Sequence, residues 1–223
     1  MKQQNPTTDT IDWAPYLQPT YHIDSDHPQV RAYALKVTAE ASTPVDKAVR
    51  LFEAVRDGIR YNPYTFSLES QVYKASETLA RGVGFCIPKA VLLTALLRVV
   101  GIPTRLRFAD VVNHLATPGL IELLQTEVFA FHGYNELYLD GRWVKATATF
   151  DTKLCRTMGV EPLAFDGHHD AVFHAFDQEG RKHMEYVKER GHHADLPFEE
   201  MIEVFQTIYP HAVETLTGER QEA

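Results

Sequence analysis

The segment from residue 86 to residue 100 constrains the fold more than any other part of the chain, because it is almost entirely apolar. Pro88 fits the first turn of a helix, and Gly101 with Pro103 stops one, so this segment predicts a helix. A helix that is apolar nearly all round is buried within a domain. Its few polar positions are Lys89, Thr94 and Arg98.

Cys86 stands at the start of this helix, after Gly82 and Gly84, which relax the approaching backbone. Its sulfur is therefore expected where unpaired backbone N–H groups and the positive end of the helix dipole converge. That position favours a thiolate, which is a nucleophile, and the same N–H groups suit the oxyanion that forms when a carbonyl is attacked. On position alone, a buried structural cysteine is the alternative.

Composition narrows the class of protein. The chain has 223 residues, 44% of them hydrophobic and 23% charged, which is typical of a soluble protein with ample core material. It shows no apolar run of membrane-spanning length and no apolar signal core at the N-terminus. The formal net charge of -8 repels phosphate backbones, so we expect neither nucleic acid nor membrane as a partner.

Cysteine usage gives an expectation for the compartment. The sequence holds 2 cysteines and no export signal, which favours the reducing cytoplasm. A cytoplasmic location argues against a disulfide between Cys86 and Cys155, and the latter is expected to be a packed residue.

The order of the predicted elements indicates an α+β fold, with helices first and an antiparallel sheet after them. The helices begin near Asp26 and Thr43, and a short one precedes Gly82. The predicted strands lie near residues 105–108, 128–139 and 142–150. We expect an N-terminal arm (1–25), a core (26–155) and a C-terminal extension packed on the core (156–223). The extension is expected to hold strands at 171–177 and 182–188 and a helix at 198–209.

Asp140 and Gly141 stand between two strand-like runs, and this pair predicts a two-residue type I′ turn. The resulting hairpin sets Glu136 opposite Lys145. Opposite charges that face each other stabilise a strand pair, so this match supports the register. Glu136 is therefore expected to be a surface partner of Lys145 and not a catalytic acid.

The same register sets His132 opposite Thr149, with Thr147 and Asp151 as diagonal neighbours roughly 7–8 Å away. A histidine general base needs a group that fixes its tautomer and holds its ring toward the nucleophile. Thr147 accepts a hydrogen bond but carries no charge. Asp151 carries the charge but lies at the strand end, where the register is least defined. Both remain candidates for this role.

Two motifs in the chain resemble those of the transglutaminase-like superfamily. The cysteine motif is GVGFC at residues 82–86 with LLRVVGIPTR at 96–105, and the histidine motif is HGYNELYLDGRW at 132–143. The resemblance implies a papain-like fold, with Cys86 on a central helix packed against an antiparallel β-sheet and His132 as its partner. The family's third catalytic residue is usually an aspartate, and its position is filled here by Thr147.

The resemblance also implies a reaction, in which Cys86 attacks an amide bond of a peptide or protein and forms a thioester with His132 as general base. Water as the acyl acceptor gives a peptidase, which we favour, and an amine gives a transglutaminase. The departure at Thr147 favours an alternative of another class, a peptide- or protein-binding module on the same fold. No cofactor or metal is expected.

Histidines in the extension point to zinc as a further alternative, because several of them lie close together along the chain. No pair has a recognised metal-binding spacing, and adjacent strand histidines point to opposite faces, so solvated loop residues are expected. They are His168, His169, His174, His183, His192 and His193, near Asp166, Asp170 and Asp195.

Overall fold

A computed structural model of the protein describes residues 12–218, so the first part of the predicted N-terminal arm, residues 1–11, lies outside the described residues. The described helices are α1 (Ala14–Leu17), α2 (Pro28–Val37), α3 (Pro44–Gly58), η1 (Ser70–Tyr73), α4 (Ala75–Arg81), α5 (Cys86–Val99), α6 (Pro118–Leu124), α7 (Thr152–Met158), α8 (Phe198–Ile208) and α9 (Pro210–Thr217). The strands are β1 (Arg60–Tyr61), β2 (Val83–Gly84), β3 (Thr104–Asn113), β4 (Val128–Leu139), β5 (Arg142–Ala146) and β6 (Met184–His193).

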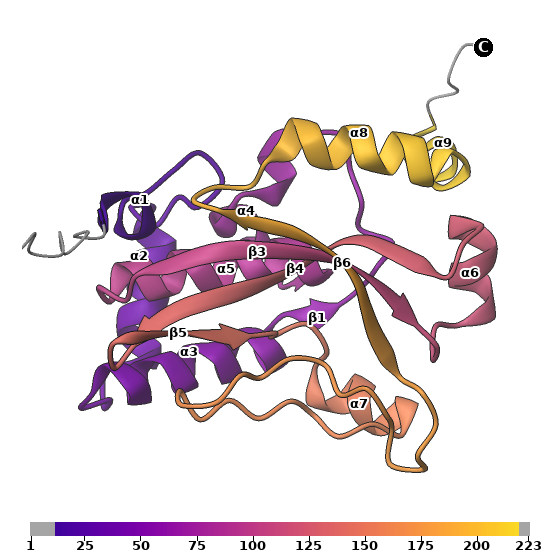
Figure 1. The fold of residues 1–223 in the computed structure, drawn as a ribbon. Helices are drawn as coiled ribbons and strands as arrows, with labels where there is room; N and C mark the ends of the chain where they lie inside the picture. Colours follow the sequence, from indigo (N-terminus) through magenta and orange to yellow (C-terminus); the bar gives the residue numbers. More distant parts are fainter. Residues whose placement is uncertain (1–11, 219–223) are drawn as a thin grey trace, which may run out of the picture.

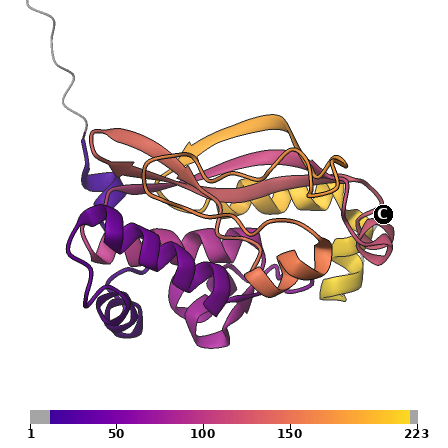
Figure 2. The ribbon, with the colours of Figure 1, turned by 90° about the horizontal axis from the view of Figure 1, so that it is seen from below.

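Helix α5 is the centre of the fold, as its apolar sequence predicts. Every residue from Ile87 to Arg98 is buried. One side of α5 packs on strands β3 and β4, and the other side contacts α2, α3 and α4 (Figure 1). Seen from below, the strands form one layer and these N-terminal helices lie on a single side of it (Figure 2). The predicted α+β fold with a central helix on an antiparallel sheet is confirmed.

Two long polar side chains of α5 are buried with partners that fix the helix to its neighbours. The ammonium group of Lys89 donates to the carbonyl oxygens of Arg56 and Ile59 at 2.9 and 2.6 Å, at the end of α3. The guanidinium of Arg98 donates to the carbonyl oxygen of Thr104 at 3.0 Å, at the start of β3. A buried charge without such partners would be costly, so these contacts define where α5 sits.

The four-stranded sheet has the order β5-β4-β3-β6, and its neighbouring strands are antiparallel. The predicted turn is confirmed, because Asp140 and Gly141 both have positive φ, 47° and 83°. The register is also confirmed, with Glu136 opposite Lys145. Strand β6 comes from residues beyond 155 and pairs with β3, and the predicted domain boundaries stay a prediction.

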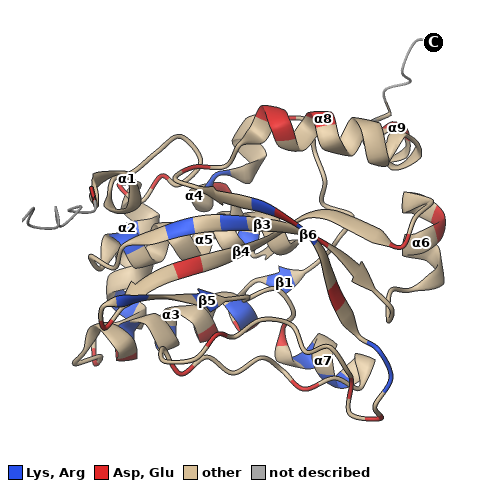
Figure 3. Ribbon diagram, viewed as in Figure 1, with Lys and Arg blue, Asp and Glu red and all other residues tan. Residues whose placement is uncertain are grey.

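Glu136 corrects the expectation of a surface partner. Its side chain is buried and pairs with Arg105 and Arg107, at 2.6 and 2.9 Å, instead of with Lys145. Charged residues of both signs lie along β3, β4 and β6 (Figure 3). The guanidinium of Arg105 also stacks on the Trp143 ring, 4.0 Å from its centroid. Neighbours on β3 therefore outcompete the partner on β5.

The chain after β5 departs from the predicted strand. Pairing with β4 ends at Ala146, and the N–H of Thr147 donates to the carbonyl of Ala171 at 2.9 Å. The predicted pairing of His132 with Thr149 is therefore wrong. The predicted strand at 171–177 is also wrong, since only isolated bridges form there. A segment distant in sequence competes successfully for the backbone groups after Ala146.

Gly133 marks a close approach between the sheet and α5. A Cβ atom added to Gly133 would lie 3.2 Å from the Cα atom of Ile87 and 3.2 Å from a ring carbon of Phe108. Glycine in a strand interior is typical of such an approach. The first turn of α5 can therefore lie directly against β4.

We expect Gly133→Ala to lower the free energy of unfolding by about 1–3 kcal/mol, because the added methyl group overpacks the contact with Ile87. Denaturant unfolding measures this change. Gly119→Ala is the matched control, since nothing lies within 4 Å of a Cβ there and alanine favours the helix. Equal stability of the two variants would contradict the close approach.

Candidate active site

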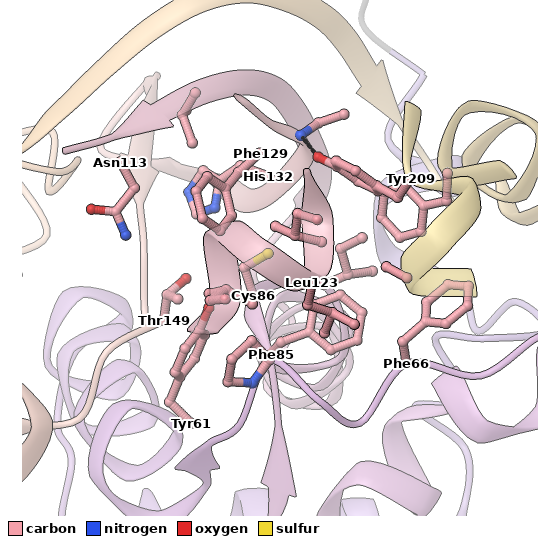
Figure 4. Close-up of a pocket in the computed structure, with 18 of the residues that line it drawn as sticks. Tyr61, Phe66, Phe85, Cys86, Asn113, Leu123, Phe129, His132, Thr149 and Tyr209 are labelled. Atoms are coloured by element: carbon pink, nitrogen blue, oxygen red, sulfur yellow. Dashed lines mark hydrogen bonds between the residues drawn. The ribbon is translucent and has the colours of Figure 1, made fainter. Parts of the chain in front are cut away.

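Cys86 and His132 line the same cavity, which has a volume of about 100 Å³. Figure 4 shows the Cys86 sulfur and the His132 ring on one side of this cavity, near Thr149 and Asn113. Cys86 is partly exposed and His132 is buried. The fold thus brings together the two residues that the sequence motifs single out.

The position of Cys86 follows from the elements on either side of it. Strands β1 and β2 pair in parallel, with Tyr61 opposite Gly84, which holds the approach to α5. Phe85 is then the N-cap in an extended conformation, and α5 begins at Cys86. Backbone N–H groups of the first turn therefore surround the sulfur, as the sequence predicts.

The direction of His132 depends on an irregularity in β4. Between two regular pairs with β3, β4 carries Ala130 and Phe131 opposite the single residue Asp110. Such a bulge re-aims the side chains next to it. Phe131 has a φ of 58°, in the left-handed region that a bulky residue rarely adopts. A strained conformation of this kind persists only where surrounding contacts hold it.

Asp110 and Arg190 supply those contacts. Asp110 accepts the N–H of Phe131 at 3.0 Å, and Arg190 donates to both oxygens of Asp110 at 2.5 and 2.9 Å. The Arg190 guanidinium also lies 4.9 Å from the centroid of the Phe131 ring. Because both charged side chains are nearly buried, this bidentate pair is held in one geometry. A residue of β6 thus helps to fix the backbone beside His132.

Burial, not the helix terminus, dominates the protonation of the pair. It raises the pKa of the Cys86 thiol to about 11, and the N–H groups of Gly133 and Ile87 lower it by less. Burial also lowers the pKa of His132 to about 3. The desolvation cost of a charged sulfur thus acts against the expected resting thiolate and outweighs the N–H groups. Burial favours a thiol and a neutral imidazole for the pair.

Asp151 makes its hydrogen bonds away from His132. Its Oδ1 accepts the N–H of Leu154 at 2.9 Å and caps α7, and its Oδ2 accepts the N–H of Tyr61 at 3.3 Å. Burial is the cause of the lowered pKa of His132, with no carboxylate acting against it. The orienting role of Asp151 stays a prediction, and the contacts give this residue a capping role.

Thr147 lies in a cluster of buried polar atoms beside His132. The His132 Nε2, Thr147 Oγ1 and Tyr186 hydroxyl atoms are buried with no hydrogen-bond partner among the described residues. Burial raises the pKa of Tyr186 to about 12. The backbone of Phe173 and the neighbouring Thr147 hydroxyl lower this pKa by a smaller amount. The rings of His132 and Tyr186 are 6.2 Å apart in an edge-on arrangement. The Thr147 hydroxyl is thus next to that of Tyr186, whose ring neighbours the ring of His132.

Sequence reasoning missed Tyr186 and Phe173, whose ring lies 4.9 Å from that of His132. A strand near Tyr186 is predicted, but nothing in the sequence pattern says that this strand pairs with β3. Both contacts join His132 to residues more than forty positions away in the printed sequence, so they are tertiary contacts. No local signal marks these residues.

The remaining candidates lie outside this cavity. Cys86 and Cys155 are both free thiols, and Cys155 is buried. Within residues 12–218, no group of three or more histidine, cysteine or acidic residues is arranged to hold a metal ion. No helix in the same range is long and apolar enough to cross a membrane.

A cysteine on the first turn of a buried helix, with a histidine on the adjoining antiparallel strand, defines the class of papain-like folds. The sequence pattern of the transglutaminase-like superfamily matches residues 31–148, which is more than half of the chain. The chain belongs to this superfamily. No curated protein matches it significantly.

Several solved structures are similar to this chain at low sequence identity. A candidate cysteine protease from Cytophaga hutchinsonii has 24% identity and a TM-score of 0.50, over 65% of this chain and 45% of that chain. The arylamine N-acetyltransferase of Mycobacterium abscessus has 15% identity and a TM-score of 0.41, over 60% and 46%. Red sea bream transglutaminase has 16% identity and a TM-score of 0.36, over 58% and 27%. The chain spans less than half the length of each.

The raised pKa of Cys86 predicts the pH dependence of its alkylation by iodoacetamide. Because the thiolate is the reacting species, the rate is expected to be low at pH 6–7 and to rise steadily above about pH 9. The rate is measured by peptide mass spectrometry, which separates Cys86 from Cys155. A fast plateau between pH 5 and 8 would instead show a thiolate–imidazolium pair and contradict this prediction.

Proposed function

We propose that this protein is a cysteine-dependent acyl-transfer enzyme that hydrolyses amide bonds of a peptide or protein. The main observation in support is that Cys86 and His132 line one cavity, with the Gly133 N–H group near the Cys86 sulfur. Water is the proposed acceptor, since it needs no second recognition site. This choice is in keeping with the candidate cysteine protease that shares the fold.

The proposed reaction starts from the neutral pair. His132 takes the thiol proton as the Cys86 sulfur bonds to the substrate carbonyl carbon, and the carbonyl π electrons move to its oxygen. N–H groups of Ile87 and Gly133 are placed to stabilise that oxyanion. Collapse breaks the C–N bond, and the leaving amine takes the proton from His132. Water, deprotonated by His132, then attacks the thioester, and the sulfur leaves as a thiolate that regains the proton.

The third role in this mechanism falls to Tyr186 together with Thr147. A neutral imidazole that uses one nitrogen as a base carries its proton on the other, and that N–H needs an acceptor. The buried Nε2 of His132 has no hydrogen-bond partner among the described residues, and the neighbouring hydroxyls of Tyr186 and Thr147 are the proposed acceptors. Catalytic hydrogen bonds often tighten only in the substrate complex. A neutral orienter leaves His132 a weak base, so a modest rate is expected.

Replacing Cys86 or His132 tests the proposed reaction. Cys86→Ala and His132→Gln are each expected to lower the hydrolysis of fluorogenic peptide amides at least about 100-fold, because each removes a reacting group. Cys155→Ala is the matched control and should retain the activity. Mass spectrometry of the product, with and without an added alkylamine, distinguishes hydrolysis from amine transfer. Unchanged activity in Cys86→Ala would remove the thiol from the reaction.

The orienting role is tested by the pH profile. Tyr186→Phe and Thr147→Val should each lower kcat about ten-fold with little change in KM, since both act through His132. Thr147→Asp should raise the pKa of His132 and move the acidic limb of kcat/KM upward by about one pH unit or more. Tyr138→Phe on the same sheet is the control. An acidic limb that stays in place in Thr147→Asp would contradict this role.

A binding module without catalysis is the second candidate function. The observation that favours it is the absence of a carboxylate partner for His132 among the described residues. Retained peptide binding in Cys86→Ala, together with no turnover by the unmodified protein, would select this candidate.

A further inference from the structure

The cavity beside Cys86 has an apolar interior. Among the residues that the structure describes, no aspartate, glutamate, lysine or arginine lines it. In Figure 4, Phe66, Leu123 and Tyr209 face the cavity from the side opposite His132 and Asn113. A ligand pocket typically combines such apolar walls with a small number of placed polar groups.

The polar side chains at the wall are largely committed elsewhere. The hydroxyl of Tyr209 donates to the carbonyl of Val128 at 2.8 Å and also accepts the N–H of Ala130, so it is its ring that faces the cavity. Asn113 uses its Oδ1 atom to accept the N–H of Leu115 at 3.0 Å. The other polar side chains of the lining, Tyr61 and Thr149, lie at the end of the cavity that holds Cys86 (Figure 4). Polar groups are therefore concentrated at the end that holds Cys86 and His132.

Elements outside the cysteine and histidine motifs build the far wall. Leu120, Leu123 and Leu124 come from α6, which contacts α9. Helices α8 and α9 add Phe205 and Val213. The charged side chains of Asp110 and Arg190 do not line the cavity, because they are hydrogen-bonded to each other. A charged substrate group placed here would lose its water without gaining a partner, which is costly.

The size of the cavity limits the occupant. An apolar cavity of about 150 Å³ holds a benzene molecule. The volume here is about 100 Å³, which is of the same order, so the occupant is no larger than a benzene ring and a leucine side chain is of suitable size. The long alkyl chain of a lipid does not fit this volume.

We propose that the cavity receives the acyl part of the substrate, and that this part is an uncharged, branched aliphatic or aryl group of about four to six carbon atoms. The statement that this group belongs to an acyl donor rests on the proposed function. The apolar side chain of a peptide residue and a short free acyl group share this chemistry. Charged and glutamine-like side chains are excluded from it.

Alkylation of Cys86 by substituted chloroacetamides tests the pocket without requiring turnover. N-isobutyl- and N-benzyl-chloroacetamide should modify Cys86 at least about ten-fold faster than the N-carboxymethyl and N-aminoethyl compounds, each corrected for its rate with glutathione. Peptide mass spectrometry gives the rate at Cys86 itself. Equal corrected rates, or a preference for a charged compound, would overturn the proposal.

A cavity-filling variant tests the far wall. Leu123→Phe should lower the ratio of the N-benzyl rate to the rate of unsubstituted chloroacetamide, because the larger ring occupies the space that the substituent needs. Leu35→Phe, at an exposed leucine on α2, is the matched control and should keep the ratio. If both variants keep it, the group binds elsewhere and the proposal fails.

Turnover assays separate the two proposed sources of the acyl group. Peptide amides with leucine or phenylalanine as the acyl residue are compared with glutamine, aspartate and lysine versions, and p-nitrophenyl esters of acetate, 4-methylpentanoate and decanoate form the second series. Cys86→Ala gives the background rate.

Ester hydrolysis rates that rise about four-fold per methylene group and fall at decanoate support the proposal. Cys86-dependent turnover of acetate or charged substrates alone overturns it while the proposed function stands. Selective alkylation without any turnover overturns the proposed function alone.

Discussion

The close approach of α5 to β4 is the contact on which the rest of the structure depends. Gly133 leaves no room for a side chain between its strand and Ile87, so the first turn of α5 lies directly on the sheet. This contact sets the Cys86 sulfur against the strand that carries His132. The buried partners of Lys89 and Arg98 fix the rest of the helix. The site is thus a consequence of packing the most apolar helix of the chain.

Desolvation explains the unusual electrostatics of the site. Apolar walls favour a thiol at Cys86 and a neutral imidazole at His132, because both groups carry charge only at a cost. The same walls disfavour charged ligands, so the protonation of the pair and the proposed acyl group have one cause. Thr147 fills the position at which the family usually has an aspartate, and Tyr186 lies beside it.

The segment after residue 155 contributes a strand to the sheet and side chains to the surroundings of the site. Strand β6 completes the sheet and brings Arg190 to Asp110 and Tyr186 to Thr147. The first pair holds the bulge next to His132, and the second forms the polar cluster behind it. Helices α8 and α9 close the apolar cavity from the other side. Residues far apart in the sequence therefore define the surroundings of a site whose two reactive groups lie on α5 and β4.

The sequence by itself determined several of the elements and singled out Cys86 and His132 as the candidate pair. An apolar helix opened by Cys86 and the Asp140–Gly141 turn are local patterns, so α5 and the β4–β5 hairpin could be predicted. Only the tertiary structure decided the protonation of Cys86, the ion pairs of Glu136 and the neighbours of His132. These depend on burial and on contacts between distant segments, such as the bond from Thr147 to Ala171 that ends β5. Local propensity carries no information about either.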